Sequence, residues 1–165
     1  MSALPRPSAA QLLPGIVGTP VRLSVKAAGL DAVVVPVEVG DGGRLLVPEK
    51  GGTAGWWKDT APPGSRQGVT VIAGHLDTRR GPAVFAPLAR AGRGDLVTVT
   101  TAAGPVRYRV TTVAVRPGAA LPVAYLSTTG PHRLVLVTCA GPYQDDIGYR
   151  DRLYVEAAPG PDPHR

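Results

Sequence analysis

The chain contains a single cysteine, Cys139, near the end of the apolar segment LVLVTCAG at 134–141. One thiol cannot form an intramolecular disulfide, and no second soft ligand accompanies it to start a zinc site. Two interpretations remain. A lone cysteine is often a small buried hydrophobe, or it is a nucleophile that receives a base or a positive charge from another part of the fold. The choice depends on which residues lie beside it.

Of the three histidines, only His75 resembles Cys139 in its setting, because it ends the apolar segment VTVIAGH at 69–75. If the two apolar segments are neighbouring core strands, their ends bring the imidazole and the thiol together. Gly74 permits a close backbone approach at this point. His132 precedes a strand beside a proline and His164 lies in the tail, so we interpret both as exposed to solvent.

Two arginines form the third group with chemical potential. Arg150 and Arg152 are two residues apart in the segment YRDRLYV, so in a strand they project from one face while Asp151 projects from the other. An arginine pair of this kind is either a solvated strand face or a source of positive charge for a nearby site. The spacing alone does not choose between these alternatives.

The elements that must position these residues are mostly strands. The chain has 18 prolines and 21 glycines with an apolar fraction of 44%, as expected for a turn-rich globular protein. Alternation and turn residues predict about eight strands and little helix, which favours a closed or nearly closed β-barrel. The predicted strands fall within 21–37, 40–48, 69–75, 96–99, 106–115, 133–139 and 149–157. Helical turns are predicted near 55–58 and within 117–132, and the strongest helix candidate is 81–92, ending at Gly92.

Composition limits the function classes. The net charge is +6, but the arginines are scattered and aromatic residues are few, which disfavours nucleic-acid binding. Acidic residues are dispersed, so we expect no metal and no cofactor. No apolar run approaches the roughly 18 residues needed to span a bilayer. We expect one folded domain at 18–158, a flexible leader or linker at 1–17 and a disordered tail at 159–165.

Taken together, VIAGHLDTRRGPAVFAPLARAGRGDLVTV, RLVLVTCAG and YRDRLYV resemble the sortases, the cysteine transpeptidases of the Gram-positive cell surface. Family members carry a Gly-His at a strand end, a Thr-Leu-x-Thr-Cys strand and an arginine on the last strand. The first threonine of that signature is Val135 here. The segments GWW (55–57), GHLD (74–77), GPAVF (81–85) and YRD (149–151) are most similar to the actinobacterial class F, with class E as a near neighbour.

This resemblance implies an eight-stranded sortase-type barrel with one or two short helices. It also implies attack by Cys139 between Thr and Gly of a Leu-Pro-x-Thr-Gly sorting signal, giving a thioacyl enzyme that an amine resolves. His75 would serve as acid and ion-pair partner. Class F sequences commonly read Tyr-Arg-Asp-Asn, which favours Arg150 as the family's arginine, whereas the patterns of other classes favour Arg152. We choose Arg150 as the catalytic arginine, because the closer subfamily should outweigh the more distant ones.

The resemblance further implies an oxyanion site and an apolar groove for the peptide. The hydroxyl of Thr138 and the backbone N–H of Ala140 are expected to act as donors to the oxyanion or to position the peptide, and Leu121 and Val123 to line the groove. The implied partners are the sorting signal of surface proteins and an amine of a peptidoglycan precursor or a pilin. We expect a monomeric ectodomain at the outer face of the cytoplasmic membrane or in the cell wall, whose membrane anchor is missing from this chain.

Two other functions fit a β-rich chain with one cysteine. An L,D-transpeptidase is also a cysteine enzyme of the cell wall, but its cysteine normally follows Ser-His-Gly, and LVT precedes Cys139 here. A non-catalytic β-barrel surface-interaction module would keep the cysteine in its core. A buried structural thiol reacts slowly with electrophiles, so labelling separates this alternative from an enzyme.

Overall fold

A computed structural model describes residues 18–38, 47–48, 51–118, 120–145 and 148–160. The predicted leader at 1–17 lies outside the described residues. So do most of the predicted tail, including His164, and most of the predicted 40–48 turn and strand.

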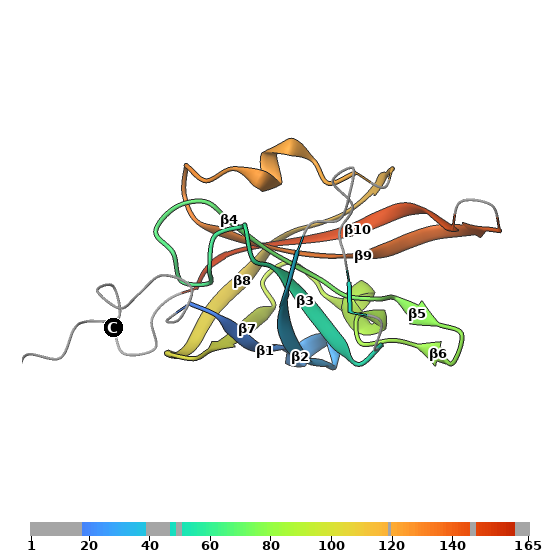
Figure 1. The fold of residues 1–165 in the computed structure, drawn as a ribbon, viewed down its shortest axis with the longest axis horizontal. Helices are drawn as coiled ribbons and strands as arrows, with labels where there is room; N and C mark the ends of the chain where they lie inside the picture. Colours follow the sequence, from blue (N-terminus) through green and yellow to red (C-terminus); the bar gives the residue numbers. More distant parts are fainter. Residues whose placement is uncertain (1–17, 39–46, 49–50, 119, 146–147, 161–165) are drawn as a thin grey trace, which may run out of the picture.

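Eight strands close into a barrel, as the sequence predicted (Figure 1). The strand order around the barrel is β1-β2-β3-β4-β9-β10-β8-β7, and a separate two-stranded sheet joins β5 to β6. The barrel strands are β1 (Pro20–Val25), β2 (Leu30–Val37), β3 (Thr53–Trp57), β4 (Val69–Ala73), β7 (Leu96–Thr101), β8 (Gly104–Pro117), β9 (Arg133–Gln144) and β10 (Gly148–Pro159). The remaining elements are β5 (Asp77–Thr78), β6 (Gly81–Pro82) and the 3₁₀ turns η2 (Lys26–Ala28), η4 (Ala86–Arg90) and η5 (Val123–Leu126).

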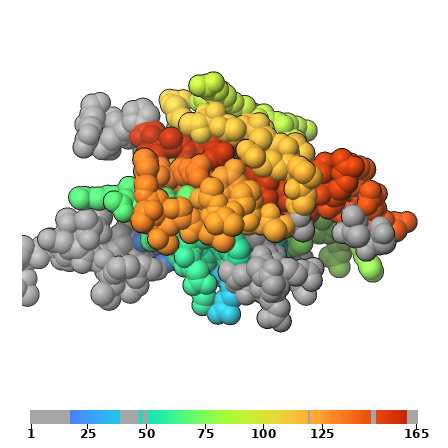
Figure 2. Space-filling view, turned by 90° about the horizontal axis from the view of Figure 1, so that it is seen from above, coloured from blue at the N-terminus to red at the C-terminus, as the bar shows by residue number. Residues whose placement is uncertain are grey.

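Side chains of β9 pack on both faces of the sheet. Leu134 and Leu136 belong to the barrel interior, whose buried cluster draws on all eight strands. Val135 and Val137 face outward and belong to a second cluster with Leu121, from the segment that connects β8 to β9. This segment, which contains η5, lies over the outer face of the sheet, where it appears in orange (Figures 1 and 2). Cys139 follows the outward-facing positions of β9, since side chains alternate along a strand.

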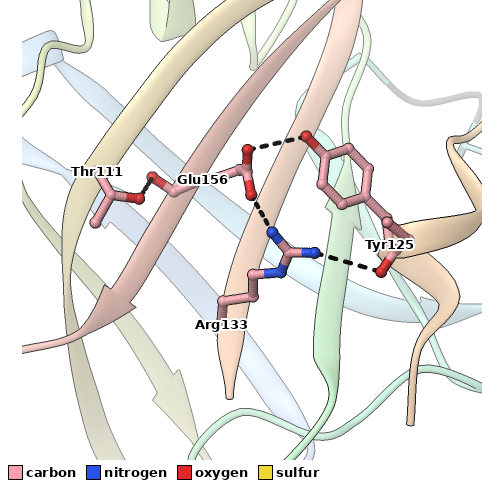
Figure 3. A network of polar contacts seen from close by, with 5 residues as sticks. Thr111, Tyr125, Arg133 and Glu156 are labelled. Atoms are coloured by element: carbon pink, nitrogen blue, oxygen red, sulfur yellow. Dashed lines mark hydrogen bonds and ion pairs between the residues drawn. The ribbon is translucent and has the colours of Figure 1, made fainter. Parts of the chain in front are cut away.

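A polar network holds the η5 segment on this face (Figure 3). Arg133 forms an ion pair with Glu156, and its guanidinium lies 5.3 Å from the centre of the Tyr125 ring. The Tyr125 hydroxyl donates to the other oxygen of the Glu156 carboxylate over 3.1 Å. The Glu156 backbone carbonyl accepts from the Thr111 hydroxyl on β8 at 3.2 Å. The segment is therefore held by Arg133 of β9 and Glu156 of β10, and Glu156 is in turn bonded to β8. The short helical turn predicted within 117–132 is confirmed.

Two helical predictions were wrong. Residues 81–92 contain β6 and only the five-residue η4, because backbone N–H groups that a helix would use internally bond elsewhere. The N–H groups of Val84 and Phe85 donate to the carbonyls of Gly51 and His75. The turn predicted near 55–58 is instead mostly part of β3, which pairs with β2 and β4. Within the described ranges, no helix is long and apolar enough to cross a lipid bilayer.

The prediction that His132 is exposed was also wrong, because its side chain is buried. Its Nδ1 lies 2.8 Å from the Gly68 carbonyl, which only accepts, so Nδ1 carries the proton. Its Nε2 therefore accepts from the Tyr108 hydroxyl, also at 2.8 Å, and that hydroxyl accepts from the N–H of Gly64. Burial lowers the pKa of His132 below its ordinary value. The neutral imidazole is thus part of the fold.

This arrangement predicts acid-sensitive stability. The folded protein favours neutral His132, so the stabilisation is present above pH ~6.5, the ordinary histidine pKa, and is lost as the pH falls below it. We expect the free energy of unfolding, measured by urea denaturation, to decrease between pH 7.5 and 5. His132→Gln should cost about 1–3 kcal/mol at pH 7.5, because buried partners lose a hydrogen bond, and should weaken the pH dependence. An unchanged pH dependence in this variant would contradict the assignment.

Candidate active site

The register of one parallel strand pair aligns His75 with Cys139. Strand β4 pairs with β9 from Val69 opposite Arg133 to Ala73 opposite Val137. His75 and Cys139 each lie two residues beyond that last pair. Side chains two residues apart in a strand project from the same face, and neighbouring strands lie about 4.8 Å apart. The predicted meeting of the two strand ends follows from this register.

Hydrogen bonds fix the backbone at the junction. The N–H of Gly74 donates to the Val137 carbonyl over 3.1 Å, and the Thr138 hydroxyl donates to the Gly74 carbonyl over 2.8 Å. The next carbonyl, that of His75, accepts from the N–H of Phe85 at 3.0 Å. A Cβ atom at Gly74 would lie only 2.6 Å from the Phe85 ring. Glycine at this position therefore lets the chain pass close to Phe85 while both strands stay in register.

A cavity of about 580 Å³ opens beside the two strand ends. Both His75 and Cys139 line it, which confirms that the structure brings these predicted residues together. The full lining is His75, Leu76, Asp77, Thr78, Arg79, Cys139, Tyr143 and Tyr149. Sequence reasoning missed Asp77, Tyr143 and Tyr149. Asp77 and Tyr149 lie in the segments GHLD and YRD that supported the resemblance, but nothing in the sequence places Tyr143 beside Cys139.

The residues around Cys139 shift the pKa of its thiol in opposite directions. The residue is partly buried, and this burial raises the pKa of its thiol. The positive charge of Arg152 works against that increase, whereas the negative charge of Asp77 adds to it. The net shift of the pKa is upward, so the resting thiol is mainly protonated at neutral pH. Its activation requires a base when substrate is attacked.

The geometry distinguishes the two arginines. Arg152 is the direct cross-strand partner of Cys139 in the β9–β10 pair, and its guanidinium donates to the backbone carbonyls of Asp151 and Tyr149. The side chain of Arg150 is 59% exposed and pairs with Asp151 at 3.3 Å, where the register shifts. Neither arginine lines the cavity. Contrary to the choice made from the class F pattern, this arrangement favours Arg152 as the cation that acts on Cys139.

A family model described as Sortase domain matches residues 23–160 of the chain. The chain belongs to the sortase family. It is accordingly a cysteine transpeptidase, and the alternatives of an L,D-transpeptidase and a non-catalytic barrel module are set aside. No curated protein matches the sequence.

Solved sortase structures share the fold at low sequence identity. Sortase A from Corynebacterium diphtheriae has a TM-score of 0.67 and 18% identity over 87% of this chain and 62% of its own. Streptococcus agalactiae sortase C1, in its complex with MTSET, has a TM-score of 0.66 and 20% identity over 86% and 68% of the two chains. Sortase C from Clostridium perfringens SM101 has a TM-score of 0.64 and 15% identity, covering 86% and 69%.

The predicted substrate-binding residues of this sortase lie in different environments. Leu121 is buried against the outer face of β4 and β9, whereas Val123 is 83% exposed. Ala140 is partly buried and packs against the barrel interior. The one hydroxyl proton of Thr138 is bonded to Gly74, so it is not available to an oxyanion. We therefore assign Thr138 a positioning role in place of the donor role expected from the sequence.

The bond from Thr138 to Gly74 predicts a selective loss of activity. Thr138→Val removes the hydroxyl that ties β9 to the residue before His75. Small misplacement of catalytic groups costs up to about 100-fold in rate, so we expect turnover to fall about 10- to 100-fold. Thr138→Ser should restore most of it. The matched control is Thr70→Val, which removes the hydroxyl of another buried threonine and with it a 2.6 Å bond from β4 to the Ala61 carbonyl.

Both valine variants should lose stability in thermal denaturation, because each leaves one carbonyl without its hydrogen-bond partner. Only Thr138→Val should lose turnover per folded molecule, measured with a sorting-signal peptide. Equal activities of the two variants would remove the positioning role.

The charges around Cys139 predict the pH profile of thiol alkylation. Only the thiolate reacts with iodoacetamide, so the rate rises as the pH passes the thiol pKa. Arg152→Ala removes the charge that lowers this pKa, and the profile should move to higher pH. Arg150→Ala should leave it in place. Stopped-flow alkylation between pH 6 and 10 measures both, and a larger shift for Arg150→Ala would reverse the assignment.

Proposed function

We propose that this sortase cleaves a Leu-Pro-x-Thr-Gly-type sorting signal between Thr and Gly and joins the new acyl end to an amine of the cell wall or of a pilin. The observation that carries the proposal is the parallel register of β4 and β9, which aligns His75 with Cys139 at one cavity. A nucleophile and a proton-transfer group at equivalent strand positions suit acyl transfer through a covalent intermediate.

In the first step, the Cys139 sulfur attacks the threonine carbonyl carbon and forms the C–S bond. The raised pKa of the thiol means that its proton must leave as the attack proceeds, and His75 receives it. The resulting imidazolium then donates this proton to the nitrogen of the departing glycine as the C–N bond breaks. This transfer lets the glycine leave as a neutral amine and leaves His75 neutral beside the thioester.

The tetrahedral intermediate places negative charge on the former carbonyl oxygen. Arg152 lies across from Cys139 and carries a fixed positive charge, which supports a role for it in stabilising both this oxyanion and the thiolate. The backbone N–H of Ala140, directly after the nucleophile, is the second donor in the proposal. In the second step an amine attacks the thioester, His75 takes a proton from its nitrogen, and the sulfur leaves as a thiolate.

The acyl part of the signal needs an apolar surface for its leucine and proline. The η5 segment supports such a site on one side of Cys139, since Leu121, just before η5, packs against the outer face of β4 and β9. On its outer side, Val123 is 83% exposed and Leu126 is 46% exposed. We place the acyl segment along these residues. From the segments GWW, GHLD, GPAVF and YRD, we further propose that the enzyme belongs to class F.

The test is a transfer assay with a Leu-Pro-x-Thr-Gly peptide library and a primary amine, followed by mass spectrometry. We expect a thioacyl adduct on Cys139 and an amide product from the wild-type protein, and neither from Cys139→Ala. His75→Ala should lower turnover at least about 100-fold, as loss of a general acid does. Arg152→Ala should lower it by about 100- to 1,000-fold, as loss of an oxyanion donor does.

Arg150→Ala is the matched control, because it removes the same charge from the same strand. Its turnover should fall by less than about ten-fold, well below the loss expected for an oxyanion donor. A greater loss for Arg150→Ala than for Arg152→Ala would return the role to Arg150. Cleavage by Cys139→Ala at the wild-type rate would overturn the proposed function.

A further inference from the structure

Six of the eight residues that line the cavity beside Cys139 have no role in the transfer chemistry above, and three of these six contact one another. Asp77 comes from β5, Tyr143 from β9 and Tyr149 from β10. All three line the cavity together with His75 and Cys139. They form a small group with one negative charge and two aromatic rings, which we call the Asp77–tyrosine group.

Direct contacts organise this group. The Tyr149 hydroxyl donates a hydrogen bond to the Asp77 carboxylate across the cavity. This bond raises the pKa of Tyr149 to about 12, so the phenol keeps its proton and remains a donor at physiological pH. The rings of Tyr143 and Tyr149 meet edge to face, with centres 5.2 Å apart. The carboxylate is therefore held next to an aromatic pair.

Asp77 has no ion-pair partner within the part of the chain that the structure describes, although Arg79 also lines the cavity. Asp77 also raises the pKa of Cys139 and so disfavours the thiolate needed in the first step. Its charge thus opposes the first step, acylation. A favourable role for this charge therefore lies in the second step, in which the amine attacks the thioester. A carboxylate beside aromatic rings is a favourable environment for an ammonium ion.

The position of the group relative to Cys139 fits the amine side of the reaction. The η5 segment packs against positions before Cys139 on β9, such as Val135 and Val137. The Asp77–tyrosine group involves positions after Cys139, including Tyr143. A peptide whose acyl part lies along η5 therefore directs its scissile nitrogen toward the cavity. The leaving amine and the attacking amine occupy equivalent places in the two steps, by microscopic reversibility.

We propose that Asp77, Tyr143 and Tyr149 bind the ammonium group of the incoming primary amine and thereby favour aminolysis over hydrolysis. This inference rests on the proposed function. The bound ammonium releases one proton to solvent, and its lone pair forms the C–N bond as the C–S bond breaks. A second proton passes from nitrogen to neutral His75, and the Cys139 sulfur leaves with the electron pair as a thiolate.

The test measures how the thioacyl enzyme is divided between amine and water. With a sorting-signal peptide and n-butylamine at neutral pH, chromatography gives the ratio of amide to hydrolysed acid. Both products come from one intermediate, so the ratio does not depend on the acylation rate or on the folded fraction. Asp77 is exposed, and loss of a contact with an exposed charge typically costs up to about five-fold in affinity. Asp77→Asn should therefore lower the ratio about two- to five-fold.

A second nucleophile separates ammonium binding from a general effect on the site. Hydroxylamine is uncharged at neutral pH, so Asp77→Asn should leave its ratio of acyl transfer to hydrolysis unchanged. Glycinamide, an α-amine, should behave like n-butylamine if the site recognises any primary ammonium, and a fall in the ratio with n-butylamine alone would show that the site prefers an alkylamine to an α-amine. Asp145→Asn is the matched control, because this exposed carboxylate lies on the β9–β10 connection and does not line the cavity.

Tyr149→Phe provides a second variant, since it frees the carboxylate without removing its charge. It should lower the n-butylamine ratio in the same direction as Asp77→Asn but by less. An unchanged n-butylamine ratio in Asp77→Asn, or an equal fall with hydroxylamine, would overturn this inference while leaving the proposed function intact. A wild-type protein that forms no acyl product would overturn the proposed function and this inference together.

Discussion

The site depends on the parallel pairing of β4 with β9. Both strands run toward the same end of the barrel, so equal advances from the last pair, Ala73 and Val137, reach His75 and Cys139 together. Because side chains alternate along a strand, a slip of one residue would turn one of these groups to the opposite face. The Gly74 backbone and the Thr138 hydroxyl tie the strands at this point and resist such a slip.

The barrel supplies two separate apolar surfaces to this strand pair. Interior residues such as Leu136 fix the strand inside the closed sheet, and outward residues such as Val137 pack beneath the η5 segment. The ion pair between Arg133 and Glu156, with Tyr125, holds that segment in place. The η5 segment thus packs beside the strand positions before Cys139, where we propose that the acyl part binds, and the cavity is lined by positions after it, such as Tyr143.

The charges around Cys139 explain why the thiol needs its partner. Burial and Asp77 raise its pKa, and Arg152 compensates in part. A thiol that stays protonated at rest is less reactive toward oxidants and stray electrophiles than a thiolate. In the mechanism that we propose, proton transfer to His75 is then part of the attack on substrate. The same carboxylate that disfavours the thiolate gives the cavity an affinity for a positive nucleophile.

The sequence by itself determined the mostly β architecture and the two strand ends that meet at the cavity. Strand alternation is a local property, and apolar segments ending at His75 and Cys139 stand out without knowledge of their neighbours. It failed for 81–92, where a helical pattern of apolar residues was overridden by backbone bonds from Phe85 to His75 and from Val84 to Gly51. It also failed for His132, because no residue near it in the sequence indicates that its side chain bonds to the buried Tyr108.

Only the tertiary structure decided which arginine faces the thiol and what else lines the cavity. Arg150 and Arg152 have the same strand periodicity, so the choice depends on which of them pairs with Cys139 across the β9–β10 ladder. Cys139 lies 13 residues before Arg152 in the chain, and the register of this ladder shifts near Tyr149. The Asp77 and Tyr149 contact joins residues 72 positions apart in the chain. Such pairings result from barrel closure, a global constraint that no short segment of sequence contains.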